Sequence, residues 1–214
     1  MICCVVLGMH ASGTSLVAHC LREMGVFMGE QFAGPVKGMP TWEDKLFFTL
    51  NVSLLTRARG NWSRPPSTER VTEAGRQADI AVLMNALIGI RESANRPWGW
   101  KDPRNCLTVH VWHPLLTEPR YICTKRDHDA IARSILARGP SRMSHREWVD
   151  LAREYDGRVQ TFLKAVKAPS FEIRFEDLVH RAKADQVLEG LARFLDIGNE
   201  AQAVERALEV VRFR

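Results

Sequence analysis

The chain has 214 residues, of which 45% are hydrophobic and 26% are charged. That length suits one α/β domain with a buried core, and the composition excludes a disordered or collagen-like chain. We therefore expect a single domain over residues 1–214. The net charge of +5 is spread over 30 basic and 25 acidic residues without a basic block, which argues against a nucleic-acid partner but suits a pocket for a small polyanion.

No apolar run approaches the roughly 18 residues that a membrane span requires. The first apolar stretch, residues 2–7, is shorter than a signal-peptide core and has no basic flank. We expect a cytoplasmic protein with no membrane partner. The five cysteines include no C-x-x-C pair, so the sequence predicts neither a disulfide framework nor a zinc site.

The first predicted elements are a strand, a loop and a helix. Residues 2–7 form a continuous apolar run, which is typical of a strand buried on both faces of a parallel sheet. Apolar residues between Leu16 and Met24 then recur at helical spacing, and Gly25 offers a stop. The stretch from Phe27 to Pro66 is rich in Gly, Pro and Trp, and we expect loops with short helices there.

The rest of the chain alternates between helical and strand patterns. Ser144 and Glu147 have the spacing of a capping box ahead of a long amphipathic helix that runs to Val166. The alternation predicts an α/β fold of three layers, with a mostly parallel central sheet flanked by helices. The other predicted elements are helices at 79–91, 129–138, 187–195 and 201–211, a helical segment interrupted at Pro114, a short strand before Lys101, and strands at 121–125 and 171–175.

The loop from Gly8 to Ser15 reads Gly-Met-His-Ala-Ser-Gly-Thr-Ser and joins the first strand to the first helix. Backbone N–H groups and the positive end of the helix converge there, so the loop is a predicted anion site. Its spacing is that of a Walker A loop, but Thr14 stands where that motif has lysine. The missing lysine disfavours a nucleotide hydrolase or a small-molecule kinase, because both use it to reach the β and γ phosphates of the nucleotide.

The loop and the residues before it resemble the 5′-phosphosulfate loop of sulfotransferases that use 3′-phosphoadenosine 5′-phosphosulfate (PAPS). Bacterial members of this family read Gly-Met-His-Arg-Ser-Gly-Thr-Ser. The resemblance implies a P-loop NTPase-like sulfotransferase fold, PAPS as co-substrate and no metal. It implies that the 5′ end of the donor is held by the loop residues His10, Ala11, Ser12, Gly13, Thr14 and Ser15.

Further segments extend the resemblance along the chain. In the family, an arginine at a strand end and a serine eight residues later hold the 3′-phosphate of the donor, and Arg126 and Ser134 have that spacing. An arginine also provides a charge-assisted fork for a phosphate. The remaining similar segments are Trp98-Gly-Trp-Lys-Asp-Pro-Arg104, Ile173-Arg-Phe-Glu-Asp-Leu178, and Lys37-Gly38 followed by Trp42-Glu43.

One position departs from the family pattern. Sulfotransferases usually carry Lys or Arg directly before the Ser-Gly-Thr of the loop, where it neutralises charge on the departing phosphate, and this chain has Ala11 there. One hypothesis is that a protonated His10, or Lys37 or Lys101, replaces the missing cation. The other is a catalytically degenerate module that binds PAPS or its product without efficient transfer.

Sulfuryl transfer also needs a general base that removes a proton from the attacking hydroxyl or amine, and more than one residue could serve. Related carbohydrate and tyrosine sulfotransferases use a glutamate beyond the first helix as the base, which makes Glu43 the first candidate. The alternative interpretation is that Glu43 is an ordinary surface acid in a salt bridge. His110 and His113 are alternatives, but histidines among apolar residues are more often packed and hydrogen-bonded in a core. Lys101 and Arg104 are expected to order the donor loop or an acidic acceptor, or to form an ion pair with Asp102 or Glu176. The expected acceptor is a hydroxyl or amine, with carbohydrate as the first class to test.

Overall fold

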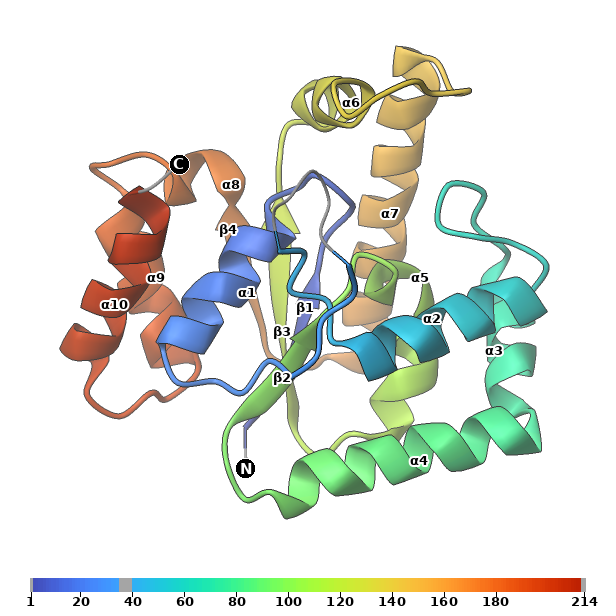
Figure 1. The fold of residues 1–214 in the computed structure, drawn as a ribbon, viewed down its shortest axis with the longest axis horizontal. Helices are drawn as coiled ribbons and strands as arrows, with labels where there is room; N and C mark the ends of the chain where they lie inside the picture. Colours follow the sequence, from blue (N-terminus) through green and yellow to red (C-terminus); the bar gives the residue numbers. More distant parts are fainter. Residues whose placement is uncertain (1, 35–39, 213–214) are drawn as a thin grey trace.

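The computed structural model describes residues 2–34 and 40–212 (Figure 1). Its four strands form one parallel sheet in the order β2-β1-β3-β4. The chain forms β2 on one side of β1 and then crosses to β3 on the other side. Ligands of such sheets bind outside the carboxyl ends of the strands, next to the strand where the crossovers change side. The strands are β1 (Cys3–Leu7), β2 (Trp98–Lys101), β3 (Pro119–Lys125) and β4 (Ser170–Arg174).

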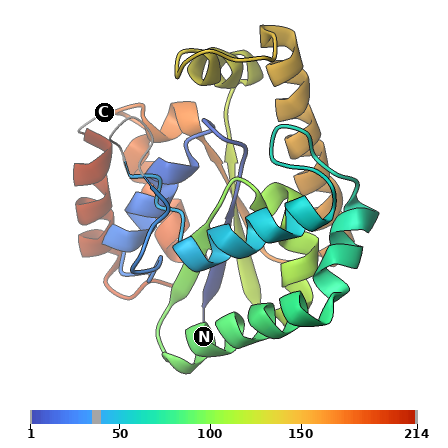
Figure 2. The same cartoon turned by 45° about the vertical axis from the view of Figure 1, so that its right-hand side comes forward.

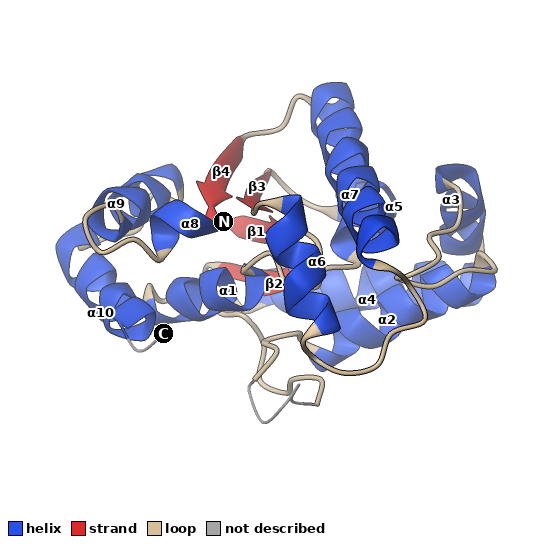
Figure 3. Cartoon of the chain, turned by 90° about the horizontal axis from the view of Figure 1, so that it is seen from above, coloured by secondary structure: helices blue, strands red, loops and turns tan. Residues whose placement is uncertain are grey.

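Helices cover both faces of the sheet, as the view from above shows (Figure 3). One face carries α1 (Thr14–Glu23), α9 (Ala184–Phe194) and α10 (Glu200–Arg212). The predicted three-layer α/β architecture with a parallel sheet is confirmed. The opposite face carries α2 (Lys45–Arg57), α3 (Thr68–Arg76), α4 (Ala78–Ser93), α5 (Asn105–Trp112) and α7 (His145–Val166), with α2 and α4 side by side in Figure 2.

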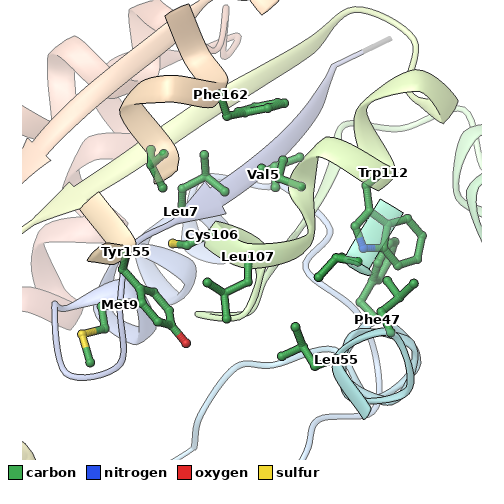
Figure 4. Close-up of a cluster of buried hydrophobic side chains, with 14 of the residues drawn as sticks. Val5, Leu7, Met9, Phe47, Leu55, Cys106, Leu107, Trp112, Tyr155 and Phe162 are labelled. Carbon is green, nitrogen blue, oxygen red and sulfur yellow. The ribbon is translucent and has the colours of Figure 1, made fainter. Parts of the chain in front are cut away.

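β1 is buried on both faces, as its continuous apolar sequence predicts. Because side chains alternate along a strand, Cys3, Val5 and Leu7 enter one helical layer while Cys4 and Val6 enter the other. Every one of these five side chains is at most 1% exposed. Figure 4 shows Val5 and Leu7 within the larger cluster, which also includes the aromatic residues Phe47, Trp112, Tyr155 and Phe162.

The middle of the chain contains more helix than the sequence predicts. α2 is a continuous helix of 13 residues, and the Asp44 carboxylate begins it by accepting hydrogen bonds from the amides of Leu46 and Phe47. α3 was not predicted, since few apolar residues mark its sequence. The helix before Pro114 ends as expected: α5 stops at Trp112 and a 3₁₀ turn, η1 (His113–Leu115), follows.

The second half agrees with the predicted elements more closely. The capping box of Ser144 and Glu147 is formed at the start of α7. Strand β4 leads into the short α8 (Phe175–Leu178), and α6 (His128–Leu136) lies beyond the carboxyl ends of the strands (Figures 1 and 3). Among the described helices, none has the length and apolar character needed to cross a membrane.

Candidate functional site

A cavity of about 960 Å³ opens at the carboxyl edge of the sheet. Segments that follow all four strands reach it: the loop after β1, Arg104 after β2, Arg126 after β3 and Phe175 after β4. The structure thus brings together side chains that are far apart in sequence. Of the residues predicted for the site, the cavity is lined by His10, Ala11, Gly13, Thr14, Ser15, Glu43, Lys101, Arg126 and Ser134.

The loop between β1 and α1 has the backbone shape of an anion cradle. Ala11 and Gly13 both lie in the left-handed region, with φ of 66° and 100°. Gly13 precedes α1 and provides no side-chain acceptor for the amides of the first helical turn. These amides and the positive end of the helix therefore remain available to an anion in the cavity. On the cavity side, a Cβ at residue 13 would overlap the ring of Phe175.

Ser12 differs from its neighbours in the loop. Its side chain is 1% exposed and does not line the cavity. The hydroxyl lies under the loop, 2.7 Å from the place where a Cβ on Gly8 would stand, and has no hydrogen-bond partner among the described residues. A contact from Ser12 to an anion in the cavity would therefore come from its backbone. The Thr14 and Ser15 side chains do line the cavity.

Arg126 and Ser134 both lie on the cavity wall, on either side of the start of α6. The Arg126 Nη1 donates a hydrogen bond of 2.7 Å to the carbonyl oxygen of Ala11, and its guanidinium lies 4.4 Å from the centre of the Phe175 ring. Its Nε is buried without a partner in the described chain. Arg126 thus holds the loop while keeping donors for a further anion.

Glu43 and Lys101 form a buried ion pair in the cavity wall. The Lys101 Nζ donates to Glu43 Oε1 at 3.0 Å and to the carbonyl oxygen of Thr41 at 2.7 Å. Burial lowers the pKa of Lys101, and the neighbouring Glu43 carboxylate opposes this shift. Glu43 Oε2 lies 3.7 Å from Arg104 Nη1, beyond hydrogen-bond reach, so this oxygen can accept another proton donor. Glu43 is a salt-bridged acid, but a buried one.

The backbone around Glu43 is fixed by contacts with two other segments. The amide of Ala33 donates to the Glu43 carbonyl oxygen at 2.8 Å, and the Lys45 amide donates to the Gln31 carbonyl oxygen at the same distance. The Ser15 hydroxyl donates to the Thr41 carbonyl oxygen at 3.1 Å. The carbonyl oxygen of Thr41 therefore accepts from both the phosphate loop and Lys101, and it ties the Glu43 segment to both.

Arg104 pairs with Asp102, as one of the two alternatives predicts. Arg104 Nη1 lies 2.8 Å from Asp102 Oδ1, and the other oxygen of this fully buried carboxylate accepts from Asn51 Nδ2 at 3.0 Å. Asn51 is the centre of a buried network that the sequence did not reveal. Its side chain also donates to Asn105 and accepts from Thr108 and Trp112. The carboxylate of Glu176 instead accepts from the Asp127 amide.

Three histidines were considered for chemistry, and only His10 lines the cavity. Its ring packs against Trp62 at a tilt of 37°, with centroids 4.2 Å apart. Burial lowers its pKa well below the usual value, and the charges of Arg104, Lys101 and Arg138 act in the same direction. These effects disfavour a protonated His10 as the replacement for the cation at position 11. His113 is packed and hydrogen-bonded to the Tyr121 hydroxyl, and His110 also lies outside the cavity wall.

The cavity wall contains two cations that sequence reasoning missed, Arg138 and Arg142. They lie between α6 and α7, on either side of Gly139-Pro140. The sequence signal was the Gly139-Pro140 pair, with an arginine on each side, after the helix predicted at 129–138. Lys37, the third candidate for the missing cation, is outside the described residues.

Comparisons with known proteins place the fold. No protein-family model and no curated protein matches this sequence. Among solved structures, the sulfotransferase domain of the Synechococcus PCC 7002 olefin synthase matches with a TM-score of 0.61 and 14% identity, over 96% of this chain and 77% of that one. Sulfotransferase STF9 from Mycobacterium avium matches with a TM-score of 0.60 and 12% identity, over 98% and 67% of the two chains. The chain has the sulfotransferase fold.

A third solved structure shows that the fold alone does not distinguish a sulfotransferase from a kinase. An unliganded sugar kinase from Janibacter sp. HTCC2649 matches with a TM-score of 0.52 and 13% identity, over 94% of this chain and 98% of that one. The sulfotransferase fold thus shares its α/β layout with a kinase, and the distinction between the two chemistries depends on the residues of the site. In residues 2–34 and 40–212, no three His, Cys, Asp or Glu side chains gather as metal ligands would.

Proposed function

We propose that this protein transfers a sulfuryl group from PAPS to a hydroxyl or amine acceptor, with carbohydrate as the first class to test. The observation that carries the proposal is the convergence of the phosphate loop, Arg126 and Ser134 on one cavity. A donor with phosphates at both its 3′ and 5′ positions needs two separate anion sites within one cleft. The sulfotransferase fold supports the same assignment.

In this proposal, the two ends of the donor bind to different elements. The 5′-phosphosulfate lies on the loop, where the amides from Gly13 to Ser15 and the positive end of α1 stabilise its charge. The 3′-phosphate lies between Arg126 and Ser134, both of which line the cavity. Arg126 has a buried Nε without a partner in the described chain, as expected of a side chain that binds a further anion.

The transfer step uses Glu43 as the general base. The acceptor oxygen or nitrogen forms a bond to sulfur while the bond from sulfur to the bridging phosphate oxygen breaks. The acceptor proton passes to Glu43 Oε2, and the electron pair of the broken bond stays on the phosphate of the leaving adenosine 3′,5′-bisphosphate. Lys101 orients this carboxylate through Oε1, which leaves Oε2 directed to the acceptor.

Ligand binding tests the donor assignment directly. We expect adenosine 3′,5′-bisphosphate to raise the melting temperature of the protein, and ATP with Mg²⁺ to do so much less. Arg126→Gln should abolish most of the shift. If ATP with Mg²⁺ stabilises the protein and adenosine 3′,5′-bisphosphate does not, the donor assignment is wrong and a kinase-like function is favoured.

Transfer of labelled sulfate from PAPS to a panel of sugars, alcohols and amines tests the reaction. Glu43→Gln should lower the rate by about 100-fold or more, the range for a lost general base. The matched control is Glu154→Gln, which removes an exposed carboxylate paired with Arg158. Equal activity of the two variants would overturn the role of Glu43.

A second function is supported by Ala11. The loop provides no cation at that position, and this is the pattern of a module that binds PAPS or its product for regulation or assembly rather than for transfer. Ala11→Arg discriminates between the two functions. A binding module would bind the nucleotide as well as before and gain transfer only in the variant, whereas an active enzyme already transfers as wild type.

A further inference from the structure

The proposed transfer needs a cation near the departing 5′-phosphate, and Ala11 does not supply one. The described candidates from the sequence are unsuitable. Lys101 is 2% exposed and its ammonium is engaged by Glu43 and by the Thr41 carbonyl oxygen. Burial and cationic neighbours disfavour a protonated His10. Arg126 donates to the loop backbone and, in the proposed function, belongs to the 3′-phosphate.

Because Arg104 is paired with Asp102, Arg138 and Arg142 are the cations that remain on the described part of the cavity wall. Arg138 follows α6, which lies beyond the carboxyl ends of the strands (Figures 1 and 3), and it lines the same cavity as His10, Glu43 and Arg126. Its guanidinium makes no hydrogen bond or ion pair with any residue in 2–34 or 40–212. A guanidinium with all of its donors available, in a wall already rich in cations, has the properties of an anion-binding group.

Arg138 has electrostatic neighbours on several parts of the cavity wall. Burial lowers its pKa, the charge of Arg126 lowers it further, and the Glu43 carboxylate opposes the shift. The charge of Arg138 in turn lowers the pKa of His10 in the phosphate loop. Arg138 thus lines one cavity with Arg126, Glu43 and the phosphate loop. In the proposed function, the sulfuryl group is transferred within this cavity.

We infer that Arg138 replaces, from the end of α6, the cation that the phosphate loop lacks at Ala11. This inference rests on the proposed function. The guanidinium binds oxygens of the 5′-phosphosulfate and neutralises the charge that gathers on the phosphate as its bond to sulfur breaks. Arg142 lines the same cavity and provides the comparison: in this inference Arg138, and not Arg142, contacts the 5′-phosphosulfate.

Three nucleotides that differ only in their phosphates locate the contact. Arg138→Gln should weaken binding of adenosine 5′-monophosphate and of adenosine 3′,5′-bisphosphate by the same factor, about 10- to 100-fold, the range for a hydrogen bond to a charged group. Binding of adenosine 3′-monophosphate should not change. Arg126→Gln should show the reverse pattern, because it is assigned to the 3′-phosphate. Isothermal titration calorimetry measures all three dissociation constants.

Arg133→Gln is the matched control. It removes one positive charge from α6, five residues before Arg138, and both side chains are exposed, but Arg133 lies 3.8 Å from Asp127 and does not line the cavity. We expect less than about a threefold change in any dissociation constant, as for an exposed ion pair. If Arg138→Gln behaves like Arg133→Gln, or weakens only the ligands with a 3′-phosphate, the inference is overturned.

Rescue separates this inference from the proposed function. Arg138→Gln should lower the rate of transfer from PAPS by more than 100-fold, and Ala11→Lys in the same chain should recover at least tenfold of that loss, because it restores the family arrangement. A wild-type protein that binds none of the three nucleotides would refute the proposed function. A protein that binds and transfers, but is indifferent to Arg138, would refute only the inference.

Discussion

The Lys101 ammonium and the Glu43 carboxylate lie 3.0 Å apart, and their side chains are only 2% and 9% exposed. Removal of one partner from a buried pair leaves an uncompensated charge, which costs about 3–5 kcal/mol. We therefore expect Glu43→Gln and Lys101→Met each to lower the free energy of unfolding by that order. The double variant should lose much less than the sum, because it leaves no unpaired charge. Urea unfolding of the four proteins measures this coupling.

Additive losses in that cycle would contradict a direct interaction between the two side chains. Arg153 and Asp150 provide the comparison pair: they lie 2.9 Å apart but are 63% and 56% exposed. Their removal should cost no more than about 1 kcal/mol, since solvent screens exposed ion pairs.

Gly13 is required by both its backbone angle and its surroundings. Its φ of 100° is unfavourable for any residue with a Cβ, and that Cβ would overlap the Phe175 ring. Gly13→Ala should therefore destabilise the protein by about 2–4 kcal/mol, through strain and overlap together. It should also weaken nucleotide binding, because the amides beside it would shift.

Gly25→Ala is the control that separates strain from overlap. Gly25 has a similar φ of 92°, but a Cβ there would meet no other atom within 4 Å. We expect a loss of about 1–2 kcal/mol from backbone strain alone and no change in nucleotide binding. Equal losses at Gly13 and Gly25 would show that Phe175 does not press on the loop. Thermal and urea unfolding give the comparison.

The fold was predictable because local patterns and sheet architecture agree. The continuous apolar run of residues 2–7 identified a strand buried on both faces, and the glycine loop after it fixed the carboxyl edge as the place of the site. In a parallel sheet the residues at the ends of the strands meet at that edge, and Lys101 and Arg126 both line the cavity there.

The rest of the site depends on contacts that periodicity does not encode. Ser12 points under the loop because Gly8 leaves room there, and nothing in the sequence distinguishes it from Ser15. Arg138 reaches the cavity only because α6 lies beyond the strand ends, a tertiary arrangement. The hypothesis of a protonated His10 is disfavoured by the cations near that ring, which the sequence did not reveal.

The buried hydrogen-bond network around Asn51 predicts that a single substitution there lowers the stability of the protein substantially. Asn51 is fully buried, and its amide bonds to Asp102, Asn105, Thr108 and Trp112. Asn51→Ala removes four buried hydrogen bonds and leaves Trp112 Nε1 without a partner among the described residues, while Asp102, Asn105 and Thr108 keep at least one other partner each. An unsatisfied buried polar group costs about 1–3 kcal/mol, and each lost hydrogen bond adds to that. We expect a total loss of about 3–5 kcal/mol by urea unfolding.

Asn85→Ala is the control for that variant. Asn85 is exposed on α4 and donates only to the Ala81 carbonyl oxygen one turn before it. The substitution should change stability by less than about 0.5 kcal/mol, as for other exposed positions. A similar effect at both positions would mean that the buried network contributes little, and that the packing of the surrounding tryptophans is sufficient.

The pH dependence of stability should have a contribution from His110. Burial lowers its pKa, the charge of Arg158 acts in the same direction, and the Thr68 backbone and Glu69 oppose the shift. In the unfolded chain a histidine takes up its proton near pH 6.5, whereas the folded protein resists protonation there. The contribution of His110 to stability is therefore fully present above about pH 6.5 and is lost as the pH falls toward its folded pKa.

His110→Gln removes this titration. Between about pH 7.5 and pH 5, the free energy of unfolding of the variant should fall less than that of the wild type, by at most about 1.4 kcal/mol for each pH unit. Urea unfolding at several pH values measures the two profiles. Profiles that stay parallel throughout this range would contradict the assignment, because a constant difference reports only the lost packing of the ring. Profiles that converge toward acid, with the variant less destabilised there, would confirm that the buried imidazole remains neutral in the fold.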